Sequence, residues 1–223
     1  MSYFLLIFSV LLGVILVLLI KPNKNLTRLL LAFSGAYLLS VTVLHLLPEV
    51  YTVDANFTIS GIFILAGIIL QSILESFSKG AEHGHVHISN DNSNFPWLLF
   101  ISLCIHSFLE GFPIHQHNDM VYGVFIHKIP IAALLTSYLL KSKYMKKQAV
   151  AFVIIFTIMT PLGTLVSNSV SLDQNFLVSI NALVIGIFLH ISTTILFEAS
   201  EGHKFNLSKL VAICLGVLIA YFI

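Results

Sequence analysis

Long apolar runs alternate with short polar segments along the whole chain. Each run has about the length that a helix needs to cross a hydrocarbon core ~30 Å thick, which is about 20 residues. Backbone groups inside a bilayer have no water to bond, so runs of this kind must be helical. We therefore predict an all-α integral membrane protein, with one transmembrane domain over residues 1–223. Its eight spans should lie at about 3–20, 26–47, 57–77, 96–116, 122–140, 148–168, 176–197 and 206–223.

The positions of the basic residues test this helix count independently, because cytoplasmic loops are enriched in Lys and Arg. If both termini lie outside, eight crossings place every basic residue except Lys128 on the cytoplasmic side. These residues are Lys21, Lys24, Arg28, Lys79, Lys141, Lys143, Lys146, Lys147, Lys204 and Lys209. We therefore expect both termini outside and a histidine-bearing cytoplasmic loop at 78–95. No basic residue precedes the first run, so we expect a membrane span there rather than a signal peptide.

Composition agrees with a membrane protein and narrows the function classes. Hydrophobic residues make up 57% of the chain and charged residues only 9%, against about 25% charged in typical soluble domains. A formal net charge of +1 gives no reason to expect nucleic-acid binding. Cys104 and Cys214 both lie in apolar runs and suggest neither a disulfide framework nor a thiolate metal site. The phosphate-binding loop motif of nucleotide-driven pumps is absent, so we expect no ATP motor and no organic cofactor.

The fourth and fifth runs carry ionisable residues that are expensive to place in lipid. Such a side chain near the bilayer centre costs about 2.5–3.5 kcal/mol on insertion scales, so it usually marks a pathway or site. His106 and Glu110 are four residues apart and share one helix face. The short connection between the two runs predicts an antiparallel pair, which brings His127 to the depth of Glu110. Two imidazoles and a carboxylate in a dry interior suit Zn²⁺ or a related transition metal.

Prolines lie beside these residues. Pro113 and Pro130 each remove an amide donor and free a carbonyl group one turn earlier, and Pro161 repeats the pattern in the sixth run. Non-helical backbone at membrane depth is tolerated where it lines a cavity or is buried in protein. The simpler alternative is a packed helix pair held by a buried Glu110–Lys128 ion pair, with the histidines as ordinary core residues.

The order of these motifs resembles that of the ZIP (Zrt/Irt-like protein) metal transporters. HSFLEG at 106–111 and HKIP at 127–130 resemble the paired signatures of that family, approximately HNxx(E/D)G and (H/Q)(E/D)xPxE. HLLPE at 45–49, TPLG at 160–163 and GIFLHIS at 186–192 agree as well. The resemblance covers essentially the whole chain. It implies a metal centre in a central pair, helices four and five, between two three-helix inverted repeats. No clear self-similarity between such repeats is visible in the sequence.

By this resemblance, His106, Glu110 and His127 are ligands of the family's first metal site. The positions where the family often carries further ligands are altered, and in this chain they hold Ser107, Lys128, Ile131 and Thr160. A protonated lysine cannot ligate a cation and repels one at close range. We therefore predict a single-metal site, in which Lys128 replaces the second cation electrostatically and pairs with Glu110.

Other polar residues are candidates for loose metal contacts along a pathway. They lie in the cytoplasmic loop, at the outer mouth and near helix ends, where solvation, capping or packing explains them about equally well. These candidates are His45, Glu49, His83, His85, His87, His115, His117, Asp119 and His190. We interpret Glu75, Glu198 and Glu201 as ordinary interfacial charges.

These features predict transport of divalent transition-metal cations towards the cytoplasm by alternating access, with the ion bound between two bundles that rock against each other. Zn²⁺ is the first candidate, but His/Glu sites also accept Fe²⁺, Mn²⁺, Co²⁺ or Cd²⁺. The alternative is an intramembrane zinc-dependent hydrolase, which would need a general base that the remaining carboxylates do not supply. A structural or sensing protein is a third hypothesis. The expected partners are divalent metal ions and the lipid bilayer.

Compact loops favour a multi-pass protein of a prokaryotic inner (cell) membrane. The sequence leaves a homodimer open.

Overall fold

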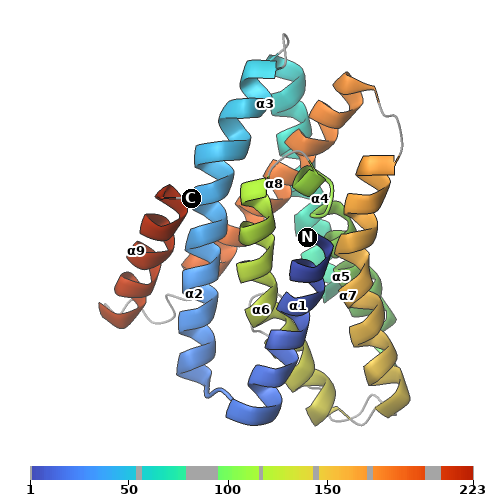
Figure 1. Ribbon diagram of the computed structural model, residues 1–223, viewed down its shortest axis with the longest axis vertical. Coiled ribbons are helices and arrows are strands. Elements are labelled where there is room, and N and C mark those ends of the chain that lie inside the picture. The colour runs from blue at the N-terminus through green and yellow to red at the C-terminus, as the bar shows by residue number, and fades with distance from the viewer. Residues whose placement is uncertain are drawn as a thin grey trace.

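The computed structural model describes residues 2–53, 57–78, 95–115, 118–142, 146–169, 173–198 and 207–222, and every regular element in these ranges is helical (Figure 1). The elements are α1 (Ser2–Ile15), η1 (Leu16–Ile20), α2 (Lys24–Val41), η2 (Thr42–Leu46), α3 (Leu47–Val53), α4 (Phe57–Ser78), α5 (Trp97–Leu109), η4 (Pro113–His115), α6 (Asn118–Lys141), α7 (Lys146–Ser169), α8 (Gln174–Glu198) and α9 (Leu207–Tyr221). Because η1 continues α1, and η2 and α3 continue α2, the described ranges hold eight helical segments besides the single 3₁₀ turn η4. The predicted all-α class is confirmed.

Six of these segments are long and apolar enough to cross a membrane, whereas Trp97–Leu109 and Leu207–Tyr221 are shorter. Helix α5 ends at Leu109, before the predicted boundary at residue 116, because Pro113 interrupts the hydrogen-bond ladder there. The second run instead continues past its predicted end to Val53. The π-helical turn η2 ends two residues before Pro48 and widens the helix at the carbonyl groups that Pro48, which lacks a donor, cannot bond.

Successive segments run in alternating directions (Figure 1). The turn from α1 to α2, the ends of α4, α6 and α8, and the starts of α5, α7 and α9 therefore lie towards one end of the molecule, which we call the basic end. It holds the described basic residues other than Lys128, namely Lys21, Lys24, Arg28, Lys141, Lys146, Lys147 and Lys209. This distribution matches the predicted topology, although which end faces the cytoplasm remains a prediction.

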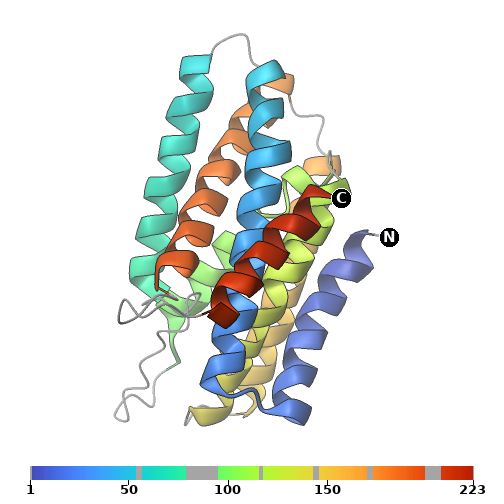
Figure 2. The same ribbon diagram turned by 90° about the vertical axis from the view of Figure 1, so that its left-hand side faces the viewer.

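The helices pack as two bundles. In the first bundle, α1 packs along α6 and α5 packs along α7. In the second bundle, α4 packs along α8 and α2 packs along α9, and Figure 2 shows these four helices side by side. The two bundles meet mainly where α2 contacts α6 and where α4 contacts α5.

Glycines permit the closest helix crossings of the second bundle. A Cβ atom added at Gly67 of α4 would lie 1.9 Å from the carbonyl oxygen of Leu183 on α8. A Cβ atom at Gly216 of α9 would lie 2.6 Å from the carbonyl oxygen of Phe33 on α2. Neither distance is sterically possible, so both positions require glycine. Small residues of this kind let helix backbones approach in lipid, where packing rather than the hydrophobic effect drives association.

The packing also reveals the inverted repeat that the sequence does not show. The α4–α8 pair corresponds to the α9–α2 pair, and the α1–α6 pair corresponds to the α7–α5 pair. Corresponding helices run in opposite directions (Figure 1). The same number of residues separates Lys24 from Gln174, where α2 and α8 begin, as separates Phe57 from Leu207, where α4 and α9 begin. Packing inside the two bundles therefore follows the pattern of two inverted three-helix units with α5 and α6 between them.

Candidate metal centre

Two of the predicted ligands lie at the point where α5 ends. Glu110 follows the last residue of the helix with an α-helical backbone, and its N–H donates a hydrogen bond of 3.0 Å to the carbonyl of His106. The spacing of one helical turn is therefore kept although the regular helix stops. As a result, the His106 and Glu110 side chains point from the same face, with His106 Nε2 at 3.3 Å from Glu110 Oε2.

His127 of α6 completes a compact cluster. One ligand atom of each of His106, Glu110 and His127 lies within 4.8 Å of the others. The three residues are 3%, 0% and 1% exposed, so the cluster is dry. The two imidazole rings lie 6.3 Å apart between centroids and nearly perpendicular, at 78°. The structure thus brings together the residues that the sequence singles out.

The geometry of the cluster suits one zinc-sized ion. Zinc binds imidazole nitrogen and carboxylate oxygen at about 2.0–2.2 Å in a tetrahedral arrangement, which puts ligand atoms about 3.3–3.6 Å apart. The separation of His106 Nε2 and Glu110 Oε2 already falls at this value. A small movement of His127 towards these two atoms would complete a three-ligand site. A fourth position would remain for water or a backbone carbonyl.

Lys128 lies beside the cluster, also buried at 2% exposure. Its Nζ lies 2.5 Å from Glu110 Oε1 and donates a hydrogen bond of 3.1 Å to Ser107 Oγ. It also lies 4.3 Å from the centroid of the Phe156 ring on α7, a cation–π contact. A buried ammonium needs such compensation for its lost hydration. The ion pair of the simpler sequence interpretation is therefore present, but it involves only Oε1 and leaves Oε2 directed at His106.

Helix α7 supplies hydroxyl groups to the broken end of α5. Thr160 Oγ1 lies 2.7 Å from Glu110 Oε1 and 2.8 Å from the carbonyl oxygen of Ser107. Thr164 donates to the carbonyl of Gly111 at 2.9 Å, and Ser167 donates to that of Phe112 at 3.1 Å. These bonds satisfy carbonyls that the interrupted helix leaves free. The sequence analysis missed Thr164 and Ser167; their spacing along one face of α7 was the available signal.

The altered family positions divide into two kinds. Lys128 and Thr160 place donor groups on Glu110 Oε1, and Ser107 supports both of them, because its hydroxyl oxygen accepts from Lys128 and its carbonyl accepts from Thr160. Ile131 instead belongs to an apolar cluster of the core and is 4% exposed. This position therefore contributes packing and offers no ligand atom.

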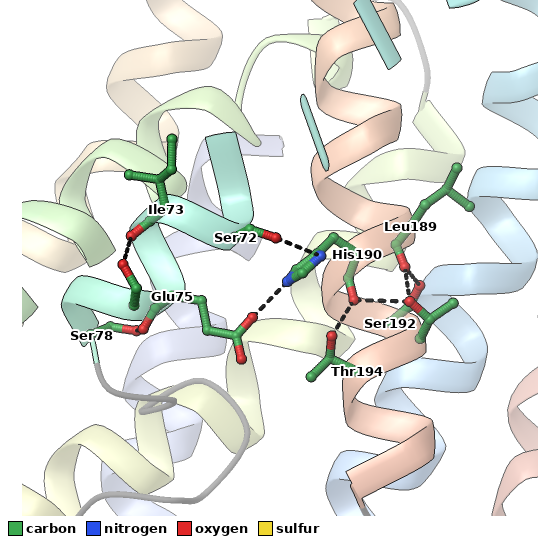
Figure 3. Close-up of polar contacts among 10 residues, drawn as sticks. Ser72, Ile73, Glu75, Ser78, Leu189, His190, Ser192 and Thr194 are labelled. Carbon is green, nitrogen blue, oxygen red and sulfur yellow. Dashed lines mark hydrogen bonds and ion pairs between the residues drawn. The ribbon is translucent and has the colours of Figure 1, made fainter. Parts of the chain in front are cut away.

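A second polar group lies in the second bundle, towards the basic end (Figure 3). His190 Nε2 of α8 lies 2.6 Å from Glu75 Oε2 of α4, and Ser72 Oγ lies 3.5 Å from His190 Nδ1. The His190 and Glu75 side chains are about one-fifth exposed. Glu75 is thus a partner of a candidate pathway histidine, not the ordinary interfacial charge that we expected. Sequence spacing could not reveal this pair, because it depends on how α4 packs against α8.

Among the described residues, the cluster of possible metal ligands consists of His106, Glu110 and His127 and does not include the other candidate contacts. His45 is half-buried in η2, and Glu49 is exposed on α3. His83, His85, His87, His117 and Glu201 lie outside the described residues, as do the side chains of His115, Asp119 and Glu198.

Comparison with known proteins identifies the family of the chain. The model of the ZIP Zinc transporter family matches residues 92–223, which is more than half of the chain and spans α5 to α9. A protein of Plasmodium falciparum (isolate 3D7) named "Zinc transporter ZIP1" is 32% identical over 136 residues. The aligned part covers 56% of this chain and 38% of that relative, so the chain spans well under two thirds of the relative's length.

Proposed function

The chain belongs to the ZIP zinc transporter family, and from this premise we propose that it carries divalent transition-metal cations, Zn²⁺ first among them, across a membrane towards the cytoplasm. The observation that carries the proposal is the buried His106–Glu110–His127 cluster, with ligand atoms within 4.8 Å of one another. Family membership favours a transporter over the intramembrane hydrolase. The protein is a multi-pass membrane protein, with six long apolar helices in the part of the chain that the structure describes, and we propose a cell (inner) membrane as its location.

The proposed site holds one metal ion at a time. Lys128 places its ammonium 2.5 Å from Glu110 Oε1, where a second cation would otherwise approach the same carboxylate. Two unit charges of like sign close together in a dry interior repel strongly, so a protonated Lys128 excludes that second ion. The ligand set is then two imidazoles and Oε2, a three-ligand arrangement that leaves a position open.

The charge balance of the site favours release as well as binding. Glu110 and Lys128 together carry no net charge, so a divalent ion enters without a surplus of negative charge to hold it. Fewer anionic ligands weaken the binding of a divalent cation, and a transport site must release what it binds. Fe²⁺, Mn²⁺, Co²⁺ and Cd²⁺ fit the same donor set and remain candidate substrates.

The arrangement of bundles supports alternating access, with one change from the sequence interpretation. We expected the metal between two bundles, but all three ligands come from α5 and α6, which both belong to the first bundle. Lys128 and Thr160 belong to that bundle too. We propose that the first bundle moves against the second with its metal site intact. The His190–Glu75 pair, nearer the basic end of the second bundle, would be a later contact for the ion.

The test is zinc uptake into liposomes that contain the purified protein. We expect uptake by the wild type and loss of uptake in His106→Ala, Glu110→Gln and His127→Ala, with each variant still folded. Cys104→Ala is the matched control, since Cys104 is a buried residue of α5 outside the cluster. A wild-type protein that retains bound zinc but shows no uptake would contradict the proposal and favour a sensing role.

A further inference from the structure

An apolar pocket lies at the basic end of the first bundle, far along α5 from the metal centre. Its volume is about 180 Å³. It opens between the start of α5 and the start of α7. Its walls are Phe95, Trp97, Phe100, Ala151, Phe152 and Ile155, and Gln148 is the one polar residue that lines it.

The walls of this pocket are ordered aromatic rings. Phe100 and Phe152 meet edge to face, with centroids 4.7 Å apart, and Phe95 and Trp97 meet in the same way at 4.8 Å. The surroundings face lipid, since Trp97 is 63% exposed and its apolar neighbour Leu98 is 61% exposed. Tryptophan is enriched at the boundary between headgroups and acyl chains. The pocket therefore opens towards the hydrocarbon just below a membrane surface.

A basic side chain lies at the edge of the α7 face that lines the pocket, on the side of Ala151. Lys147 precedes Ala151 by four residues, which places it one turn closer to the start of α7 and therefore nearer the membrane surface. Lys147 is exposed. Lys146, also exposed, is rotated away by one residue. An apolar slot with a cation at its membrane-surface end is complementary to a lipid that has an anionic headgroup.

We propose that this pocket binds an anionic phospholipid of the leaflet at the basic end. One acyl chain lies against the aromatic walls, and the phosphate lies beside Lys147. The occupant is a membrane lipid because the lining is apolar except for Gln148 and the pocket opens onto lipid-facing residues. The proposal depends on the membrane location of the protein and not on metal transport, so either idea can fail without the other.

The single tryptophan of the chain makes the pocket directly observable. Bromine atoms on an acyl chain quench tryptophan fluorescence on contact, so brominated lipids report occupancy beside Trp97. The full chain is reconstituted in phosphatidylcholine with increasing fractions of brominated phosphatidylglycerol or brominated phosphatidylcholine. We expect the anionic lipid to bind about fivefold more strongly, the effect of one basic residue near such a surface. In Lys147→Gln this preference should disappear, whereas Lys146→Gln should keep most of it.

A second reporter separates the pocket from the general charge of this end. Leu19 is 78% exposed and lies two residues before Lys21. In a Trp97→Phe background, we introduce Leu19→Trp as the only tryptophan. Its fluorescence should show a clearly smaller preference for quenching by the anionic lipid. Equal quenching of Trp97 by both lipids would overturn the proposal. So would an equal loss of the preference for the anionic lipid in Lys147→Gln and Lys146→Gln. Absence of quenching by either lipid would overturn it too, because another segment would then cover the pocket.

Discussion

At the scale of single residues, the two oxygens of Glu110 have different roles. Oε1 lies beside the Lys128 ammonium and the Thr160 hydroxyl, while Oε2 faces His106. The carboxylate therefore belongs at once to an ion pair and to the proposed ligand set. Removing the Glu110 carboxylate should affect both the stability of the fold and the binding of metal. The two effects can be separated by substituting its ion-pair partner Lys128 in the same protein.

We predict that Glu110→Gln lowers the free energy of unfolding by about 3–5 kcal/mol, because it leaves the Lys128 charge buried without its counterion. The double variant Glu110→Gln/Lys128→Met should recover most of this loss, since no unpaired charge remains. Zinc uptake should stay absent in both. Thermal unfolding in detergent, with uptake assays on the same preparations, measures the two effects. Recovery of uptake together with stability would show that Glu110 is not a ligand.

The role of Lys128 as a substitute for a second cation gives another prediction at this scale. Lys128→Glu replaces an ammonium with a carboxylate beside Glu110, so two adjacent carboxylates should now hold a second divalent ion. Metal analysis of the purified protein should change from one bound zinc per chain to two. Lys128→Met removes the charge without adding a ligand and should stay at one. A stoichiometry of one in Lys128→Glu would contradict the electrostatic substitution.

At the scale of elements, the interruption of α5 decides where the site lies. The sequence analysis recognised Pro113 and the one-turn spacing of His106 and Glu110, so it could predict a broken helix beside the candidate ligands. It placed the end of the helix too late, because apolar residues continue past the break. It could not find what satisfies the broken end, since the Thr164 and Ser167 hydroxyls reach it from α7, more than fifty residues away in sequence.

The same element pair gives a prediction about how α7 supports the carboxylate. Thr160→Val and Thr164→Val each remove one buried hydroxyl from α7 with little change of shape, and each should cost about 0.5–1.5 kcal/mol of stability. Only Thr160 touches Glu110. We therefore expect Thr160→Val to weaken zinc binding about tenfold, as loss of a group that orients a ligand does, while Thr164→Val leaves affinity almost unchanged. Zinc titration by calorimetry compares the two; equal affinities would show that α7 does not position the ligand.

At the scale of the whole molecule, the helix number and alternating topology followed from apolar run length and the placement of lysine. The inverted repeat did not, because it is preserved in packing rather than in residue identity. Gly67 and Gly216 take equivalent crossings, yet the residues around them differ enough to hide the relation. The His190–Glu75 pair was hidden for the same reason. Such contacts join helices that are far apart in the sequence. They depend on how the helices pack, which the order of residues along the chain does not reveal.

Movement of one bundle against the other can be tested by locking their interface. Gly123 of α6 faces Val41 of α2, and a Cβ atom at Gly123 would lie 3.8 Å from a Val41 side-chain carbon. That carbon is Cγ1, so side chains at the two positions touch, and cysteines there form a disulfide when their Cβ atoms come within about 3.5–4.5 Å of each other. In a background without Cys104 and Cys214, oxidation of Val41→Cys/Gly123→Cys should abolish zinc uptake, and reduction should restore it.

A crosslink inside one bundle is the matched control. A Cβ atom at Gly35 of α2 would lie 3.2 Å from the Cβ of Ile195 on α8, so Gly35→Cys/Ile195→Cys joins two helices that move together in the proposed mechanism. Its oxidation should leave uptake nearly unchanged, provided that the protein stays folded. If both crosslinks stop uptake, motion within the second bundle is required as well. If neither does, the metal crosses without relative movement of the bundles, and a fixed pore between α5 and α6 would replace alternating access.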